Sequence, residues 1–127
     1  MNRTLSQKRA EYSLKEVLNL KCNRKEFKSF SAGAPAMILK NGFGQSLAFW
    51  LSKGTDKELK IKENDKHIIL LKMIFNWLVS NKFIEANNIK GFLLKITEIP
   101  QKKYMECQHE TLKLLEWVKR FANAELQ

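Results

Sequence analysis

The sequence contains few of the residues that end helices or form turns. Its 127 residues include only five glycines and two prolines. Strands joined by tight turns need more turn residues than this, and no alternating apolar–polar run persists. We therefore expect an all-α protein: a single compact domain, residues 1–127, of about six helices with a long C-terminal helix. That length is sufficient to bury a core without disulfides.

Cysteine and histidine are also scarce, with two of each. Cys22 and Cys107 have no CxxC spacing, so we interpret both as small hydrophobes in a reducing cytoplasm. Cys107 and His109 are two residues apart and point to different faces of a helix. His67, beside Asp65 at a helix start, is interpreted as part of a cap. We predict no catalytic residue, no metal ligand, no cofactor and no small-molecule substrate.

Long apolar runs are absent as well. The most apolar window, residues 68–79, is interrupted by Lys72 and Asn76 and is too short to span a bilayer. The first residues, MNRTLSQKR, are not followed by the apolar segment of a signal peptide. We expect a cytoplasmic protein without a membrane partner.

Positive charge, in contrast, is abundant and uneven. The chain has 23 Lys and Arg against 13 Asp and Glu, a net charge of +10. Residues 1–62 carry +8 of this and residues 63–127 only +2. Such a balance indicates a polyanionic partner, and charge alone does not separate nucleic acid from a membrane surface. Because 19 of the cations are lysines, we expect contacts to a phosphate backbone without sequence readout.

Helix signals divide the chain into segments joined by short connections. The residue before Pro35 is pushed out of the α region, which predicts a break at residues 31–35 and a new short helix from Pro35. The polar stretch 53–66 is interpreted as a mobile loop. The predicted helices cover residues 4–20 with Thr4 or Ser6 as the cap, 24–31, 35–40, 44–53, 65–80 with Asn64 or Asp65 as the cap, 87–97, and a long final helix after Pro100.

The final helix has a wide apolar band and a narrow polar strip. The strip consists of Lys102, Glu106, His109, Lys113, Glu116, Arg120 and Asn123. The band is wider than one neighbour requires, so a second molecule is a candidate to cover part of it. We predict subunit contacts at Leu112, Trp117 and Phe121.

Two further features have alternative interpretations. The glycines of the NGFGQS sequence, residues 41–46, resemble a phosphate cradle, but the GK[ST] ending of a P-loop is missing and no strand precedes them. We favour a helix end followed by a helix start. Trp50, Trp77 and Trp117 are interpreted as core or interface anchors, with base stacking as the alternative.

Three stretches carry a family pattern in order and spacing. They are residues 7–17; residues 34–53, which include APAMI and NGFGQSLAFWLSK; and Tyr104 followed by ETLKLLEWVKRFA at residues 110–122. Together they resemble the small subunit of the type III-B CRISPR RNA-targeting effector, the Cmr complex. The resemblance spans nearly the whole chain.

This resemblance implies a non-catalytic, all-α structural subunit in antiviral defence. Copies of such a subunit stack into a filament beside the backbone subunits that carry the guide RNA, and other subunits cleave the target. The implied partners are guide and target RNA, the backbone subunit and further copies of the chain. From charge placement, we predict RNA contacts at Lys8, Arg9, Lys15, Lys40, Lys53, Lys119 and Arg120.

Two other functions remain alternatives. A small helical DNA-binding regulator would need base-reading Arg, Asn or Gln on one exposed helix face, and the four arginines are scattered. A small nuclease would need His67 or His109 in a metal-dependent site, and no such spacing exists.

Overall fold

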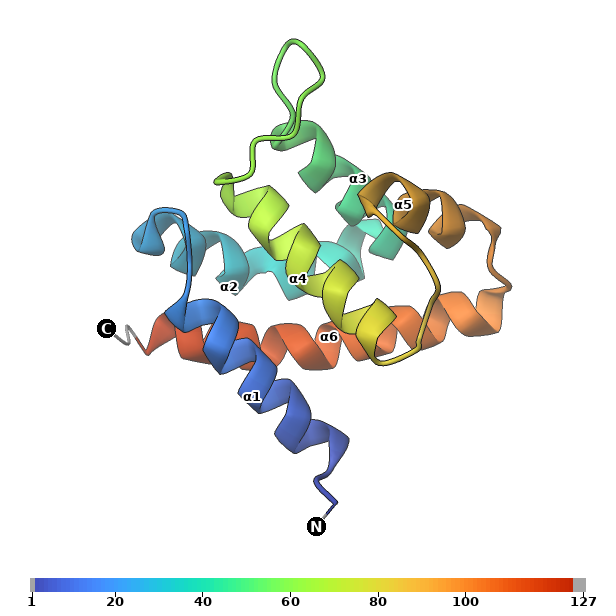
Figure 1. The fold of residues 1–127 in the computed structure, drawn as a ribbon, viewed down its shortest axis with the longest axis horizontal. Helices are drawn as coiled ribbons and strands as arrows, with labels where there is room; N and C mark the ends of the chain where they lie inside the picture. The colour runs from blue at the N-terminus through green and yellow to red at the C-terminus, as the bar shows by residue number, and fades with distance from the viewer. Residues whose placement is uncertain (1, 125–127) are drawn as a thin grey trace.

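The computed structural model describes residues 2–124, and its elements are all α-helices (Figure 1). Apart from one isolated β-bridge, this part of the chain contains no strand. The all-α prediction and the long C-terminal helix are confirmed. The helices are α1 (Leu5–Leu18), α2 (Arg24–Asn41), α3 (Phe43–Lys53), α4 (Lys66–Ser80), α5 (Ile89–Glu98) and α6 (Gln101–Asn123).

The long helix α6 is the element against which the others are arranged. Helices α1 and α2 make the most extensive contacts with it, and α4 also touches it. In Figure 1, α1 crosses the C-terminal half of α6, and α3 and α5 lie above α6. The core lies between α2, α3, α4, α5 and α6, and its largest fully buried side chains include Phe27, Trp50, Ile74, Phe92 and Leu114.

The pattern predicted for α6 agrees with its packing. All seven residues of the predicted polar strip are exposed. Leu112, Trp117 and Phe121 are half-buried, at the edges of the buried stripe. The buried residues are Cys107, Glu110, Thr111, Leu114, Leu115, Val118 and Ala122. One charged residue therefore lies inside the stripe.

That residue, Glu110, forms a buried ion pair with Arg9 of α1. Arg9 Nε donates to Glu110 Oε2 at 2.6 Å and Arg9 Nη2 to Glu110 Oε1 at 2.7 Å. Trp77 Nε1 of α4 donates to Glu110 Oε2 at 2.8 Å. The hydrogen bond to Glu110 raises the pKa of Arg9. Both charged residues are less than one-tenth exposed. This placement corrects the assignment of Arg9 to an RNA-contacting surface, because its guanidinium faces the protein interior.

Helix α1 is capped at its start and held to α4 at its middle. Thr4 and Gln7 form a capping box, which resolves the predicted choice between Thr4 and Ser6. In the middle, the Tyr12 ring lies 5.1 Å from that of Trp77, and its hydroxyl donates to the Met73 carbonyl at 2.8 Å.

The predicted break at Pro35 is wrong, since α2 continues through it. Proline supplies no N–H to the preceding turn, which costs about 3 kcal/mol in a helix interior. Residues at helical spacing on both sides of Pro35 are buried on one face, at Phe27, Ser31, Ala34 and Ile38. Burial of this continuous face outweighs the local cost. The small residues Ser31 to Ala34 also limit crowding before the proline ring.

The segment between α3 and α4 forms no helix and contains a hydrogen-bonded turn, and the mobility expected of it stays a prediction. An isolated antiparallel bridge joins Thr55 to Ile61. The Asp56 carboxylate accepts hydrogen bonds from the N–H groups of Glu58 at 2.8 Å and Lys60 at 2.9 Å. Leu59 at its tip has a φ of 64° and is 84% exposed. Figure 1 shows this turn projecting away from the helices.

The remaining boundaries lie close to the predicted ones. Asp65 caps α4 by accepting from the N–H groups of His67 and Ile68. Asn88 caps α5 by accepting from Gly91. Helix α4 was predicted to be apolar nearly all round and central, and only Asn76 and Ser80 on it are exposed.

We predict that replacing Glu110 with Gln lowers the free energy of unfolding by about 3–5 kcal/mol. The amide leaves the buried Arg9 charge without a counter-ion, and this desolvated charge is the main cost. Denaturant unfolding followed by circular dichroism measures the change.

The matched control is Glu11→Gln, which removes an exposed carboxylate that pairs with Arg3 at 2.9 Å. Solvent screens that pair, so we expect only a small change. Arg9→Met and the double variant complete a thermodynamic cycle. Additive effects of the two single substitutions would contradict a coupled buried pair.

Candidate nucleic-acid interface

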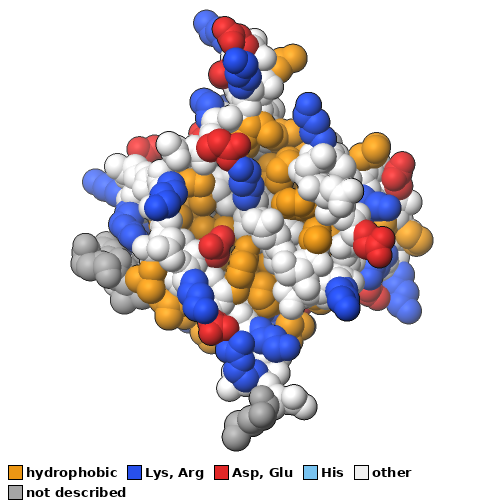
Figure 2. All heavy atoms as spheres, viewed as in Figure 1, with side chains coloured by type: hydrophobic (Ala, Val, Ile, Leu, Met, Phe, Trp, Pro, Cys, Tyr) orange, Lys and Arg blue, Asp and Glu red, His pale blue; other side chains and the backbone are white. Residues whose placement is uncertain are grey.

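The structure distributes the predicted RNA-contacting residues over three regions instead of one patch. Lys8 and Lys15 are exposed on α1, Lys40 and Lys53 lie at the last residues of α2 and α3, and Lys119 and Arg120 lie near the end of α6. In Figure 1, α1 crosses α6 in the lower part of the view, and α3 lies in the upper part. The space-filling view in Figure 2 also shows blue side chains interspersed with red ones across this face.

Some of these residues have partners within the chain. Lys15 Nζ lies 3.4 Å from Glu11, whose pKa is lowered by hydrogen bonds from Arg3 and Lys15. Lys53 Nζ lies 5.3 Å from the centre of the Phe49 ring, a cation–π distance. These two lysines are exposed, whereas Lys119 is half-buried at the edge of the apolar band.

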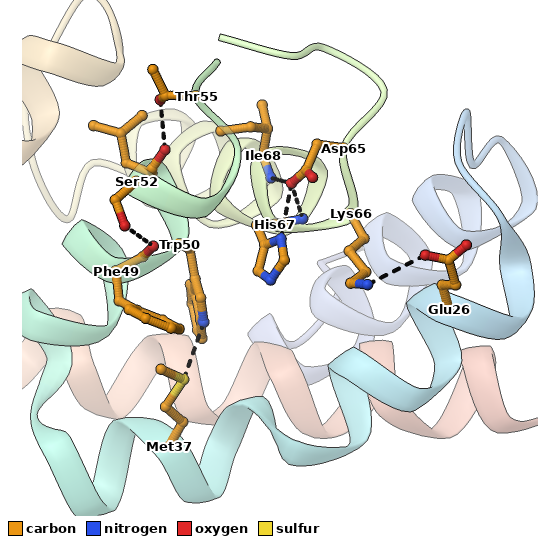
Figure 3. Close-up of polar contacts among 11 residues, drawn as sticks. Glu26, Met37, Phe49, Trp50, Ser52, Thr55, Asp65, Lys66, His67 and Ile68 are labelled. Atoms are coloured by element: carbon orange, nitrogen blue, oxygen red, sulfur yellow. Dashed lines mark hydrogen bonds and ion pairs between the residues drawn. The ribbon is translucent and has the colours of Figure 1, made fainter. Parts of the chain in front are cut away.

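The densest group of cations lies where α1 joins α2, and the sequence interpretation missed it. Lys21, Arg24, Lys25 and Lys28 fall within eight residues, and we call them the basic corner. Glu26 is the one acidic residue in this stretch, and it faces Lys66 of α4 at 3.3 Å (Figure 3). Four cations within eight residues were the signal that could have located this corner.

Arg24 fixes the geometry of the basic corner. Its Nη1 donates to the Val17 carbonyl at 3.1 Å and its Nη2 to the Leu18 carbonyl at 3.0 Å. Both carbonyls lie in the last turn of α1, where the Val17 carbonyl otherwise accepts a long bond of 3.4 Å from the Leu20 N–H. The guanidinium therefore acts as a cap at the negative end of the helix dipole. Asn23 caps α2 at the same junction by accepting from the Glu26 N–H. The corner is therefore held rigid by hydrogen bonds on both helices.

The glycines of residues 41–46 do not form a phosphate cradle. Gly42, with a φ of 94°, ends α2 and begins α3, as the favoured interpretation predicted. The Gly44 N–H, which a phosphate would need, donates instead to the Tyr104 hydroxyl of α6 at 2.8 Å. The Ser46 N–H donates to the Gly42 carbonyl at 3.1 Å. The N–H groups of Gly44 and Ser46 at the start of α3 are therefore already hydrogen-bonded within the fold.

The histidines occupy separate surroundings. His67 Nδ1 lies 3.0 Å from Asp65 Oδ1, and the imidazole packs 4.6 Å from the Phe30 ring. Figure 3 shows the Asp65 carboxylate in contact with both the main chain of the first turn of α4 and the His67 ring. His109 is exposed on α6. Among residues 2–124, no three His, Cys, Asp or Glu side chains are grouped to hold a metal ion.

The predicted subunit-contact residues are less exposed than other apolar side chains. Trp117 stacks on Phe121 with ring centroids 5.8 Å apart, and both are half-buried. The exposed large apolar side chains lie on other elements: Leu18, Leu39, Phe49, Leu59 and Leu94. In the part of the chain that the structure describes, no helix is long and apolar enough to cross a membrane.

We predict that neither cysteine reacts as an activated thiol at neutral pH. Burial raises the pKa of Cys22, and Glu26 and Asp65 raise it further; burial also raises the pKa of Cys107. Since the thiolate is the reactive form, iodoacetamide labelling of Cys22 should increase only at alkaline pH, and Cys107 should be labelled only after unfolding. Mass spectrometry at pH 7 and pH 9 measures this, with urea-unfolded protein as the reference. Rapid labelling of either native thiol at pH 7 would contradict it.

A comparison with protein-family models matches residues 5–125 to a family described as CRISPR-associated protein (Cas_Cmr5). The match includes all six helices and both the basic corner and the buried ion pair. It agrees with the resemblance that the sequence itself shows.

Proposed function

The chain belongs to the Cmr5 family of CRISPR-associated proteins, the small subunit of the type III-B effector, and from this premise we propose that it is a non-catalytic structural subunit that binds RNA backbone. It also stacks with copies of itself and with the backbone subunit of the Cmr complex. The observation that supports RNA contact most strongly is the basic corner at the α1–α2 junction.

The chemistry of the basic corner suits a phosphate backbone. Lys21, Arg24 and Lys25 are exposed and lie on a junction that hydrogen bonds hold in place. Arg24 donates two hydrogen bonds to main-chain carbonyls, which are neutral and do not cancel its positive charge. Lysine-rich surfaces bind phosphates as point charges and carry little base recognition. Lys8 and Lys15 extend the positive charge along α1, and we retain them as secondary contacts. Lys40, Lys53, Lys119 and Arg120 also remain predicted contacts.

The surface of α2 and α3 supports the proposed subunit contact. Residues 27–55 contain no Asp or Glu, and their charged residues are Lys28, Lys40 and Lys53. Leu39 of α2 is 69% exposed and Phe49 of α3 is 44% exposed, and the two helices pack on each other. Each of these exposed apolar side chains has a lysine beside it, since Lys40 follows Leu39 in the sequence and Lys53 lies over the Phe49 ring. Such side chains fit a partner with apolar and acidic groups. Leu112 and Trp117 of α6 remain candidates for a second subunit contact.

The surroundings of the titratable groups support the non-catalytic part of the proposal. Asp65 uses one carboxylate oxygen on the cap of α4 and on His67. Glu110 is used by Arg9 and Trp77. Both carboxylates serve the fold, which is the role expected of a structural subunit.

We predict that single-stranded RNA binding weakens steeply with salt and shows little sequence preference. For Z phosphate contacts, the slope of log K against log salt is about −0.7Z for single strands. Replacing both Lys21 and Lys25 with Gln should reduce the magnitude of this slope by about 1.4. Fluorescence anisotropy at several salt concentrations measures it.

The matched control replaces Lys82 and Lys90 with Gln, which removes the same charge from exposed positions near α5. We expect the slope of this variant to equal that of the unmodified protein. RNA binding that does not respond to salt, or an equal loss in both double variants, would contradict a contact centred on the basic corner.

We predict that Leu39→Glu prevents co-purification with the other Cmr subunits while leaving the isolated chain folded. The new carboxylate stands on an exposed apolar position, so it disturbs a partner and not the core. Leu94→Glu, at a 60% exposed position on α5, is the control. Normal assembly of the Leu39→Glu variant would exclude the α2–α3 surface as the subunit contact.

A further inference from the structure

The turn between α3 and α4 projects away from the helices and carries Leu59 at its tip (Figure 1). Its base lies directly on α4, since a Cβ atom on Gly54 would come within 2.2 Å of the Ile68 side chain. The Lys62 N–H donates to the Gly54 carbonyl at 2.8 Å and closes this base. The tip is therefore presented to the surroundings on a hydrogen-bonded stem.

The hydrogen bonds at the tip place residue 59 in a left-handed conformation. The Leu59 N–H donates to the Asp56 carbonyl at 3.0 Å, and the Asp56 N–H donates to the Lys60 carbonyl at 2.9 Å. This is the pattern of a three-residue hairpin loop, whose last residue is left-handed. Glycine is favoured at that position, because a side chain there crowds the main chain. The sequence has leucine instead, with a φ of 64°.

Burial does not compensate for this strain, because Leu59 is 84% exposed. Strained residues of this kind persist mainly where a function needs them. Lys82 is the other non-glycine residue with a positive φ among residues 2–124. It lies just past the end of α4, where a left-handed residue commonly closes a helix. The strain at Lys82 therefore has a structural reason, and the leucine at residue 59 has none within the described chain.

The charges near the tip are mostly positive. Lys60 Nζ lies 3.8 Å from the Glu58 carboxylate, and the Asp56 carboxylate accepts two N–H groups of the turn. Lys57 and Lys62 are exposed and make no ion pair among residues 2–124. Figure 2 shows charged side chains around the same projection. An apolar tip with lysines close to it in the sequence is complementary to an apolar pocket that has carboxylates at its edge.

These features favour a protein partner over RNA. Leucine has no aromatic ring on which a base could stack. Asp56 and Glu58 lie in the same turn and would repel phosphate groups. The basic corner, with four cations and one acidic residue within eight positions, is better suited to RNA. Because the chain itself carries a net charge of +10, we expect the acidic pocket on a different subunit and not on a second copy.

We propose that Leu59 inserts into an apolar pocket on another protein subunit of the complex, and that Lys57 and Lys62 pair with carboxylates at the edge of that pocket. The inference rests on the proposed role as a structural subunit and deepens it, because it adds a contact separate from the α2–α3 surface. It also gives a reason for leucine at a position that favours glycine.

The test is Leu59→Gly in the full chain. Glycine relieves the left-handed strain, so the temperature of thermal unfolding should stay the same or rise. Loss of a buried leucine should nevertheless weaken binding to the Cmr complex purified without this subunit by about tenfold or more. Titration of the fluorescently labelled chain with that complex, followed by anisotropy, measures the dissociation constant. A leucine that only stabilised the fold would lower both quantities together.

Three further variants serve as controls. Leu59→Met keeps an apolar side chain at the tip and should retain most of the affinity. Lys82→Gly relieves the other left-handed residue, keeps Leu59 and should leave the affinity unchanged. Replacing both Lys57 and Lys62 with Gln should weaken binding and reduce its dependence on salt.

The outcomes separate this inference from the proposed function. Unchanged binding of Leu59→Gly to the complex, or a lower unfolding temperature, overturns the inference. Normal assembly with a loss of RNA binding would place RNA at the tip and overturn it too. In these cases the structural-subunit proposal stands if Leu39→Glu still prevents assembly. If the unmodified chain does not bind the complex, the proposed function and the inference both fail.

Discussion

The buried contact between Arg9 and Glu110 is the constraint on which the arrangement of the helices depends. It joins the first helix to the last across 101 residues of sequence. A paired and hydrogen-bonded charge is tolerated inside a protein, whereas an unpaired one is not. Trp77 adds a third helix by donating to the same carboxylate. These side chains thus specify how α1, α4 and α6 meet, with a geometry that apolar contacts alone would leave less defined.

Helix α1 needs this specification because its buried face is small. It consists of Arg9, Ser13 and Val17, of which only Val17 is apolar. The Ser13 hydroxyl is buried without a hydrogen-bond partner, so it adds little. Without Arg9, α1 would therefore hold to the domain mainly through Leu5, Tyr12 and Val17. The orientation of α1 in turn sets the position of the carbonyls that Arg24 caps, and with them the position of the basic corner.

Periodic apolar patterns allowed α4 and α6 to be predicted closely, because burial of one helix face follows from spacing alone. The continuity of α2 could not be read from Pro35, since the local cost of proline competes with the buried stripe from Phe27 to Ile38. Arg9 was predicted as surface because a charged residue in a basic segment is usually solvated. Its partner Glu110 lies in the last helix, and no helical spacing in the sequence relates the two residues. The basic corner was visible in sequence, but only the fold shows that Arg24 is hydrogen-bonded to the end of α1.

The connection between the first and last helices also governs the order in which the molecule can form. Helix α6 is synthesised after the other five, yet it supplies contacts to both α1 and α2. Contacts of such large sequence separation close late in folding. A nascent chain that still lacks α6 has no Glu110 to receive Arg9. The Arg9 guanidinium therefore stays in water until the last helix is made, and α1 can take its final position only after that.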